Sequence, residues 1–127
     1  PHKLRRKIWL KKIAQTENFK IGELNYIFCS DEYLYQINVD YLDHRTYTDI
    51  ITFDNSEKEN TIEGDIFISI DRVKDNASKH QQEEEAELSR VISHGLFHLM
   101  GYKDKSKEQS EEMRSQEDFA IKLYENT

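Results

Sequence analysis

The chain has 127 residues, of which 34% are charged and 36% hydrophobic, so it predicts one small globular domain with a well-solvated surface. No apolar run reaches membrane-spanning length and the first residues lack the apolar stretch of a signal peptide, so we expect a cytoplasmic protein without a membrane partner. The net charge of −7 argues against extensive contact with nucleic acid, and the single Cys29 excludes an internal disulfide.

The acidic total conceals a basic N-terminal segment. The first 20 residues carry a net charge of +6 and the remaining residues −13. Apolar residues at helical spacing predict a first helix over residues 4–16. Its Lys and Arg side chains either contact phosphate groups or form a solvated helix face, and the sequence leaves both readings open.

Strand and helix patterns alternate in the first half of the chain. A short apolar run predicts a strand at 24–28, and Ser30 or Asp31 can cap a second helix that ends near residue 43. Two further runs rich in Ile, Thr and Phe, at 48–53 and 65–70, predict strands, and residues 54–64 between them predict a polar loop.

The second half of the chain predicts only helices. Periodic apolar residues indicate helices at 72–80 and 83–100, and Ser106 with Gln109 forms a capping-box pattern that opens a last helix to about residue 124. The prediction is an α+β protein in which residues 1–127 form a single domain, with a small mixed β-sheet covered by helices.

The most informative segment is HGLFHLMGYKD, from His94 to Asp104. His94 and His98 lie one helical turn apart on one face, and Gly101 is suited to end the helix in a turn that swings Asp104 back toward the imidazoles. Three protein ligands leave a position open, as in catalytic zinc sites. We therefore predict a metal site at the end of a helix in the C-terminal half, although the same residues also suit an ordinary buried helix followed by a solvated turn.

Two imidazoles and a carboxylate favour zinc over magnesium, while nickel, cobalt and copper stay open. Zinc chemistry serves peptidases as well as phosphodiesterases. Metzincin peptidases have two His at this spacing, but their second motif position is a Glu that acts as general base, and this chain has Gly95 there. A zinc peptidase is therefore the alternative and not the first hypothesis, while a deaminase and a phosphodiesterase both stay open at this point.

The segment resembles the signature of the YbeY family of metal-dependent single-strand endoribonucleases, His-Gly-x-Leu-His-Leu-x-Gly-Tyr-Asp-His. The similarity extends upstream to Thr48-Asp49-Ile50-Ile51-Thr52-Phe53 and to Gly64-Asp65-Ile66, and downstream to Glu112-Met113. It covers most of the chain, and the combination of motifs is specific.

The resemblance implies a zinc-dependent endoribonuclease that acts on single-stranded RNA, matures the 3′ end of 16S ribosomal RNA and takes part in ribosome quality control in the cytoplasm. It implies His94, His98 and Asp104 as zinc ligands, with Asp104 in place of the family's third His. Small-subunit ribosomal proteins, or the basic N-terminal segment, would help to hold the RNA.

Two residues are candidates for a catalytic role. Leu42 stands where the family commonly has an Arg, and Arg45, three residues away, is the candidate to contact phosphate instead, with a simple surface charge as its alternative. Asp49 is the candidate to orient the site or accept a proton, and its alternative is a structural hydrogen-bonding role. Tyr47 and Tyr102 are candidate stacking residues for bases. The missing Arg also supports a third hypothesis, a non-catalytic ribosome-assembly factor with a structural metal.

Overall fold

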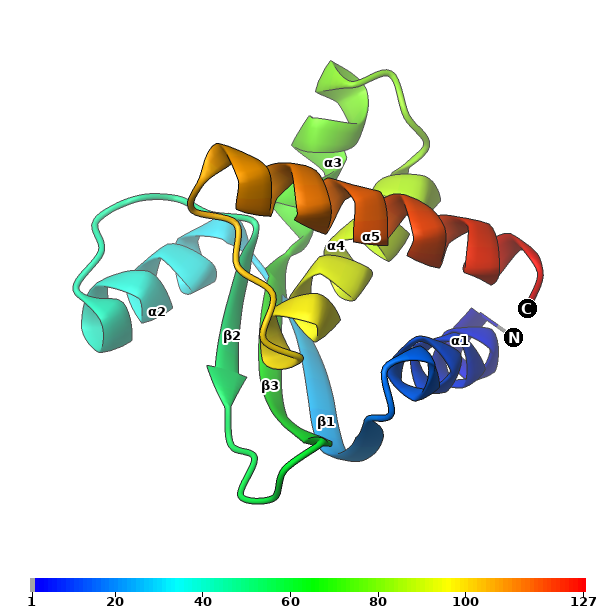
Figure 1. The fold of residues 1–127 in the computed structure, drawn as a ribbon. Helices are drawn as coiled ribbons and strands as arrows, with labels where there is room; N and C mark the ends of the chain where they lie inside the picture. The colour runs from blue at the N-terminus through cyan, green and yellow to red at the C-terminus, as the bar shows by residue number, and fades with distance from the viewer. Residues whose placement is uncertain (1) are drawn as a thin grey trace.

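The computed structural model describes residues 2–127, with side chains from Lys3 onward (Figure 1). The elements follow one another as α1 (His2–Thr16), β1 (Lys20–Cys29), α2 (Asp31–Leu42), β2 (Ile50–Asp54), β3 (Thr61–Ser69), α3 (Ile70–Lys79), α4 (Glu84–Leu99) and α5 (Lys107–Glu125). No helix in the described part of the chain is both long and apolar enough to cross a membrane.

The three strands form one mixed sheet in the order β1-β3-β2. β1 runs parallel to the central strand β3, and β2 runs antiparallel to it. Helices lie on both faces of this sheet, so the predicted α+β architecture with a small mixed sheet is confirmed (Figure 1).

Alternating side chains of β3 divide the hydrophobic core into two parts. Ile62, Ile66 and Ile68 belong to the main cluster, to which α1, α4 and α5 also contribute, whereas Phe67 points to a smaller cluster under α2. This period-two pattern is what a strand covered on both faces requires. The helix α4 thus lies over one face of the sheet, with α2 on the other.

The strands differ from the predicted ones at their ends. β3 begins at Thr61 and β1 at Lys20, because these residues pair with each other across the parallel ladder. Long-range pairing of this kind overrides the polar local sequence, so the loop predicted over residues 54–64 is shorter than expected. Ile70, predicted as the end of a strand, is instead the first residue of α3, because the Ser69 side chain accepts a hydrogen bond from the Arg72 amide and caps that helix.

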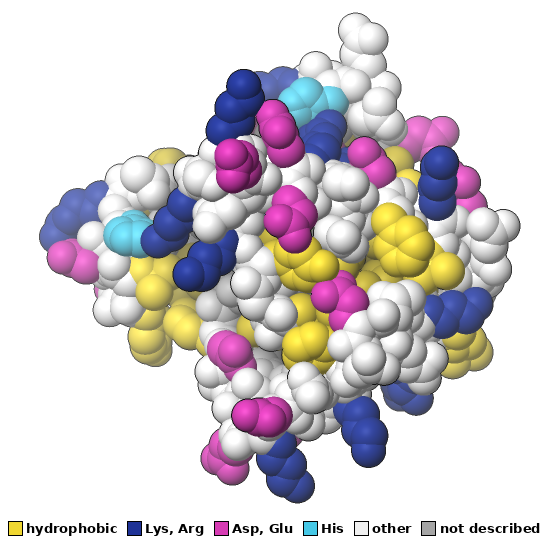
Figure 2. Space-filling view, viewed as in Figure 1, with side chains coloured by type: hydrophobic (Ala, Val, Ile, Leu, Met, Phe, Trp, Pro, Cys, Tyr) yellow, Lys and Arg dark blue, Asp and Glu magenta, His cyan; other side chains and the backbone are white. Residues whose placement is uncertain are grey.

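The basic helix α1 is anchored to the C-terminal helix. The Trp9 indole donates a 2.7 Å hydrogen bond to the carbonyl of Ala120, and the Arg5 guanidinium lies over the Tyr124 ring. Arg6 forms an ion pair with Glu85 at 2.6 Å. Two side chains of the basic segment, Arg5 and Arg6, therefore have partners within the fold. Acidic and basic side chains are interspersed on the face shown in Figure 2.

Candidate metal centre

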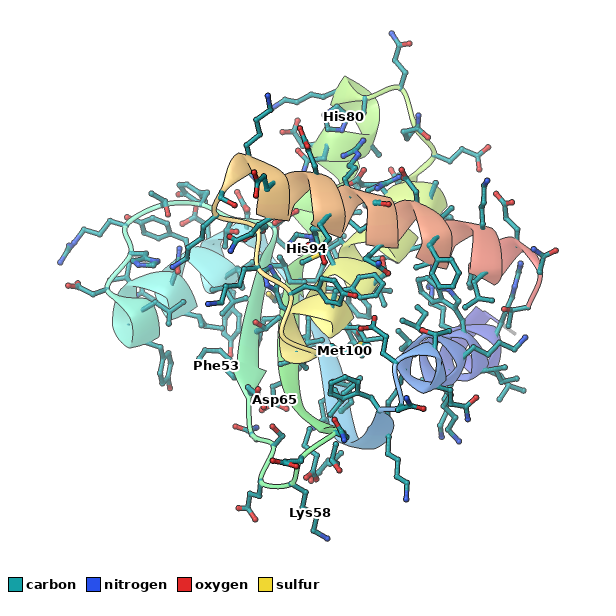
Figure 3. All side chains as sticks on the ribbon, viewed as in Figure 1. Phe53, Lys58, Asp65, His80, His94 and Met100 are labelled. Carbon is teal, nitrogen blue, oxygen red and sulfur yellow. The ribbon has the colours of Figure 1, made fainter. Side chains whose placement is uncertain are left out.

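The helix α4 carries the two histidines. Its first turn holds Glu84, Glu85 and Glu87, and acidic residues at this end favour the helix dipole. One side of the helix packs on the sheet so closely that a Cβ on Gly95 would lie 2.8 Å from Ile50 Cδ1 and 3.0 Å from Ile66 Cγ2. With Gly95 against the sheet, the half-buried His94 lies beneath α5, as Figure 3 shows.

The turn after α4 brings Asp104 back to the helix. Gly101 has a φ of 103°, a conformation that other residues rarely adopt. The Ser110 hydroxyl donates to the Asp104 carbonyl at 3.0 Å and so fixes the loop to the start of α5. The capping box of Ser106 and Gln109 at the start of α5 is present as predicted. Local turn chemistry thus sets the position of the third predicted ligand.

Three donor atoms converge at this point. His94 Nε2 and His98 Nε2 are 2.9 Å apart, and Asp104 Oδ2 lies 3.2 Å from the first and 3.4 Å from the second. Three ligands of a tetrahedral zinc ion, each about 2.0–2.1 Å from the metal, would lie about 3.3–3.4 Å from one another. The spacing of the donor atoms is therefore close to that of a zinc ligand set, and the three side chains could hold a metal ion.

The partners of the other ring nitrogens indicate that a cation belongs there. His94 Nδ1 faces a carboxylate oxygen of Glu117 at 2.6 Å, and His98 Nδ1 faces the carbonyl oxygen of Tyr102 at 3.0 Å. Because both partners only accept hydrogen bonds, each Nδ1 carries the proton and each neutral Nε2 carries a lone pair. Two lone pairs and a carboxylate oxygen then face one another, and only a cation between them, a metal ion or a proton, relieves the repulsion.

Glu117 is a site residue that the sequence analysis missed. Its side chain is 7% exposed, and besides His94 it pairs with Arg90 at 2.9 Å, while Arg90 also reaches Asp118 at 2.8 Å. A carboxylate behind a metal-binding imidazole fixes the ring's orientation and raises its basicity. The only hint in the sequence was an acidic residue on the last helix, a weak signal because many acidic residues lie there.

The charges around His94 favour its protonated form. Burial alone lowers the pKa of the imidazole, but the hydrogen bond with Glu117 and the negative charges of Glu117, Asp104 and Asp49 outweigh burial and raise the pKa. A group of acceptors that attracts a proton in this way also attracts a metal cation, and the two compete for the same nitrogen.

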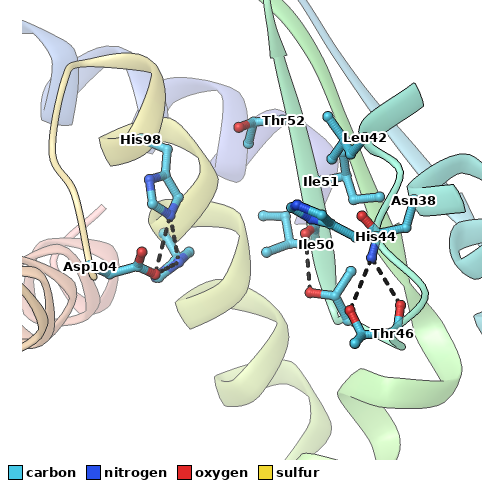
Figure 4. Close-up of a pocket in the computed structure, with 11 residues that line it drawn as sticks. Asn38, Leu42, His44, Thr46, Ile50, Ile51, Thr52, His98 and Asp104 are labelled. Carbon is cyan, nitrogen blue, oxygen red and sulfur yellow. Dashed lines mark hydrogen bonds and ion pairs between the residues drawn. The ribbon is translucent and has the colours of Figure 1, made fainter. Parts of the chain in front are cut away.

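The three donor atoms face a pocket of about 330 Å³ (Figure 4). One wall consists of His94, His98 and Asp104, and the other consists of the end of α2, the following loop and β2. The residues of this second wall are Asn38, Leu42, His44, Thr46, Thr48, Ile50, Ile51 and Thr52. The volume of the pocket lies at the lower end of the range of about 300–1,000 Å³ that is typical of small-ligand sites.

The two predicted catalytic residues lie outside the lining of this pocket. The Arg45 side chain is 75% exposed and reaches Asp43 only at 3.9 Å, whereas Leu42, three residues before it, lines the pocket. Asp49 is half-buried, and its backbone carbonyl accepts a hydrogen bond from the Ser69 amide. Its negative charge is the smallest of the contributions that raise the pKa of His94, after those of Glu117 and Asp104. The catalytic roles of both residues stay predictions.

The candidate stacking residues already have partners within the protein. The Tyr47 ring stacks on Tyr35 with centroids 4.5 Å apart, and its hydroxyl donates to Glu32 at 2.7 Å. The Tyr102 hydroxyl donates to Glu17 at 3.0 Å, and burial together with this contact raises the pKa of Tyr102 to about 12. Tyr102 thus has a structural role beside the site, and Tyr47, at 48% exposure, has the more accessible ring.

Fold and site together define a small α+β domain with a potential mononuclear His-His-Asp metal centre in a surface pocket. The model of the family described as endoribonuclease YbeY matches residues 3–125, so the chain belongs to the YbeY family. The match spans almost all of the chain and includes every residue of the centre.

Similar proteins agree with this assignment. The endoribonuclease YbeY of Cytophaga hutchinsonii is 62% identical over 115 residues, which cover 91% of this chain and 80% of that protein. The endoribonuclease YbeY of Flavobacterium johnsoniae is 52% identical and covers 91% of this chain and 83% of its own length. The solution structure of TM1509 from Thermotoga maritima superposes with a TM-score of 0.68 at 26% identity, covering 93% of this chain and 77% of the other.

Proposed function

We propose that this protein is a zinc-dependent endoribonuclease that cleaves single-stranded RNA. The observation that carries the proposal is the convergence of His94 Nε2, His98 Nε2 and Asp104 Oδ2 within 2.9–3.4 Å in a chain of the YbeY family. The printed function of the similar proteins, endoribonuclease, supports RNA as the substrate class.

The donor set suits zinc. Imidazole nitrogen and carboxylate oxygen are both accepted zinc ligands, and the three residues would hold the ion with a coordination position to spare. Zinc in such a site supplies Lewis acidity, which makes hydroxide available near neutral pH and draws electron density from a phosphoryl oxygen. The chain's own contribution is to hold His94 with Glu117 and His98 with the Tyr102 carbonyl, so that both rings present their Nε2 atoms to one point.

The geometry at Gly95 disfavours the peptidase alternative. The metzincin general base occupies this position of the motif, but here a side chain would run into Ile50 and Ile66 of the sheet. A carboxylate at residue 95 would have to displace these side chains. Residue 95 therefore supplies no general base of the kind on which that class of peptidase depends.

Arg45 and Asp49 remain the proposed catalytic residues besides the ligands. Asp49 is close enough to His94 for its charge to raise the imidazole pKa, which supports a role in tuning the site. Arg45 is free to extend toward RNA from the loop beside the pocket, because its side chain is largely exposed.

We also propose that the substrate is 16S ribosomal RNA near its 3′ end, and that the protein takes part in ribosome quality control in the cytoplasm. The resemblance of the motifs to the family supports this proposal. Small-subunit ribosomal proteins are the proposed partners that would help an acidic chain to hold RNA. Cleavage of precursor 16S RNA in purified small subunits, compared with naked RNA, tests whether such partners are needed.

A metal-reconstitution assay tests the central proposal. Wild type, His98→Ala and Asp104→Ala are stripped with chelator, reloaded with zinc, and assayed on a fluorescent single-stranded RNA, a matching duplex and a labelled peptide. We expect wild type to bind one zinc and to cleave single-stranded RNA, and both ligand variants to lose zinc and activity. His80→Ala is the matched control, since His80 does not line the pocket. Equal zinc content in wild type and His98→Ala would refute the metal centre.

A further inference from the structure

The pocket contains few groups that can bind an anion. Among the described residues that line it there is no Lys or Arg, and the wall opposite the metal ligands is formed by aliphatic side chains, hydroxyls, one amide and His44. A phosphodiester is negatively charged, and its charge grows in the transition state of hydrolysis, so a cationic or N–H donor group opposite the metal is needed. Apart from the two histidines at the metal centre, His44 is the lining residue that can carry positive charge.

The backbone around His44 is held in place by α2. Asp43 ends this helix in the left-handed conformation with a φ of 54°, and the His44 amide donates to the Asn38 carbonyl at 3.0 Å. The buried Asn38 side chain then donates to the Thr46 carbonyl at 2.9 Å and ties down the far side of the loop. These contacts fix the loop on both sides of His44 while its side chain stays exposed.

The imidazole of His44 projects into the pocket toward the side on which His98 and Asp104 lie (Figure 4). A substrate phosphate in the pocket would therefore have the three metal ligands on one side and this imidazole on the other. Arg45, the next residue, does not line the pocket.

We propose that His44 is a catalytic residue that contacts the scissile phosphate, with a ring N–H donating to one of its oxygens and the imidazolium charge stabilising the transition state. This role rests on the proposed ribonuclease function. Loss of a single donor to a developing oxyanion typically lowers kcat about 10²–10³-fold. Because His44 is exposed and outside the ligand set, its loss leaves zinc binding and folding unchanged.

The test compares wild type with His44→Ala and His44→Lys, with His80→Ala as control, using zinc-loaded proteins and a fluorescent single-stranded RNA. We expect His44→Ala to lower kcat at least about 10²-fold at unchanged zinc affinity. The kcat of His44→Lys should be at least about tenfold higher than that of His44→Ala, because lysine restores a cation. His80→Ala should behave as wild type.

Three results would overturn the role of His44: a kcat of His44→Ala within threefold of wild type, a His44→Lys variant as inactive as His44→Ala, or loss of zinc from either variant. The proposed function fails separately. If zinc-loaded wild type cleaves no RNA, or if His94→Ala cleaves as well as wild type, the ribonuclease assignment is wrong whatever His44 does.

Discussion

Replacing Glu117 by Gln is the most informative test of how the metal centre is built. Gln is nearly isosteric and keeps an oxygen that can accept from His94 Nδ1, but it removes the negative charge that now lies 2.6 Å from this ring. Loss of such a carboxylate behind a ligating imidazole typically weakens metal binding about 10–100-fold, which corresponds to about 1.4–2.7 kcal/mol. We expect a zinc Kd raised within this range.

The same substitution should also destabilise the metal-free fold. Breaking a buried ion pair by removing one partner costs about 3–5 kcal/mol, and since Arg90 keeps Asp118 as a second partner, we expect about 3 kcal/mol. Urea unfolding followed by the fluorescence of Trp9, the only tryptophan and a fully buried one, measures this free energy. Competition with a chromogenic chelator measures the zinc Kd.

Asp118→Asn is the matched control. Asp118 is the next residue on α5 and pairs with the same arginine, but its side chain is 60% exposed and it has no contact with His94. An exposed pair of this kind contributes less than about 1 kcal/mol, so this variant should keep both its zinc affinity and its stability. A Glu117→Gln protein that binds zinc as tightly as wild type would refute the contribution of the Glu117 charge to metal binding.

Three further predictions concern residues around the site. Burial raises the pKa of Glu87, so the folded state favours the protonated form, and the stability that this group contributes at low pH is lost as pH rises through the raised pKa. Glu87→Gln should therefore have a higher Tm than wild type at pH 7, and this difference should vanish in acid. An equal Tm of the two proteins at pH 7 would contradict this sign. Gly95→Ala should lose up to about 2 kcal/mol in urea unfolding, because overpacking against Ile50 costs about 1–3 kcal/mol and the gain in helix propensity offsets only about 1 kcal/mol of it. A more stable variant would show that the sheet can move away. Arg45→Ala should change the unfolding free energy by less than about 0.5 kcal/mol but reduce the salt dependence of RNA binding by about one ion, and an unchanged salt slope would remove Arg45 from the RNA site.

The elements that the sequence predicted best are those with strong local signals. The capping residues Ser30 and Ser106 fix the starts of two helices through hydrogen bonds within the next turn, and both accept the expected amide donors. Strand ends were predicted less well, because Lys20 and Thr61 become strand residues only through pairing with each other across the sheet. Such pairing joins positions far apart in the chain, and local composition does not encode it.

In the metal centre, too, the parts that depend on local sequence were predicted and the parts that depend on long-range packing were not. The spacing of His94 and His98, and a glycine at position 101 before Asp104, were sufficient to predict that the three side chains meet, because one helical turn and one tight turn bring them together. This part of the site is local, within eleven consecutive residues.

Tertiary packing alone decided what surrounds those three side chains. Glu117 reaches His94 from a helix 23 positions further along the chain, and His44, 50 residues upstream of His94, lies in the pocket wall opposite the metal ligands. Neither residue carries a signal in its own neighbourhood, since one acidic residue on an acidic helix and one histidine in a polar loop look like many others. The sequence determined the three candidate ligands because their geometry is that of a single helix end, whereas the groups around them depend on how distant elements pack.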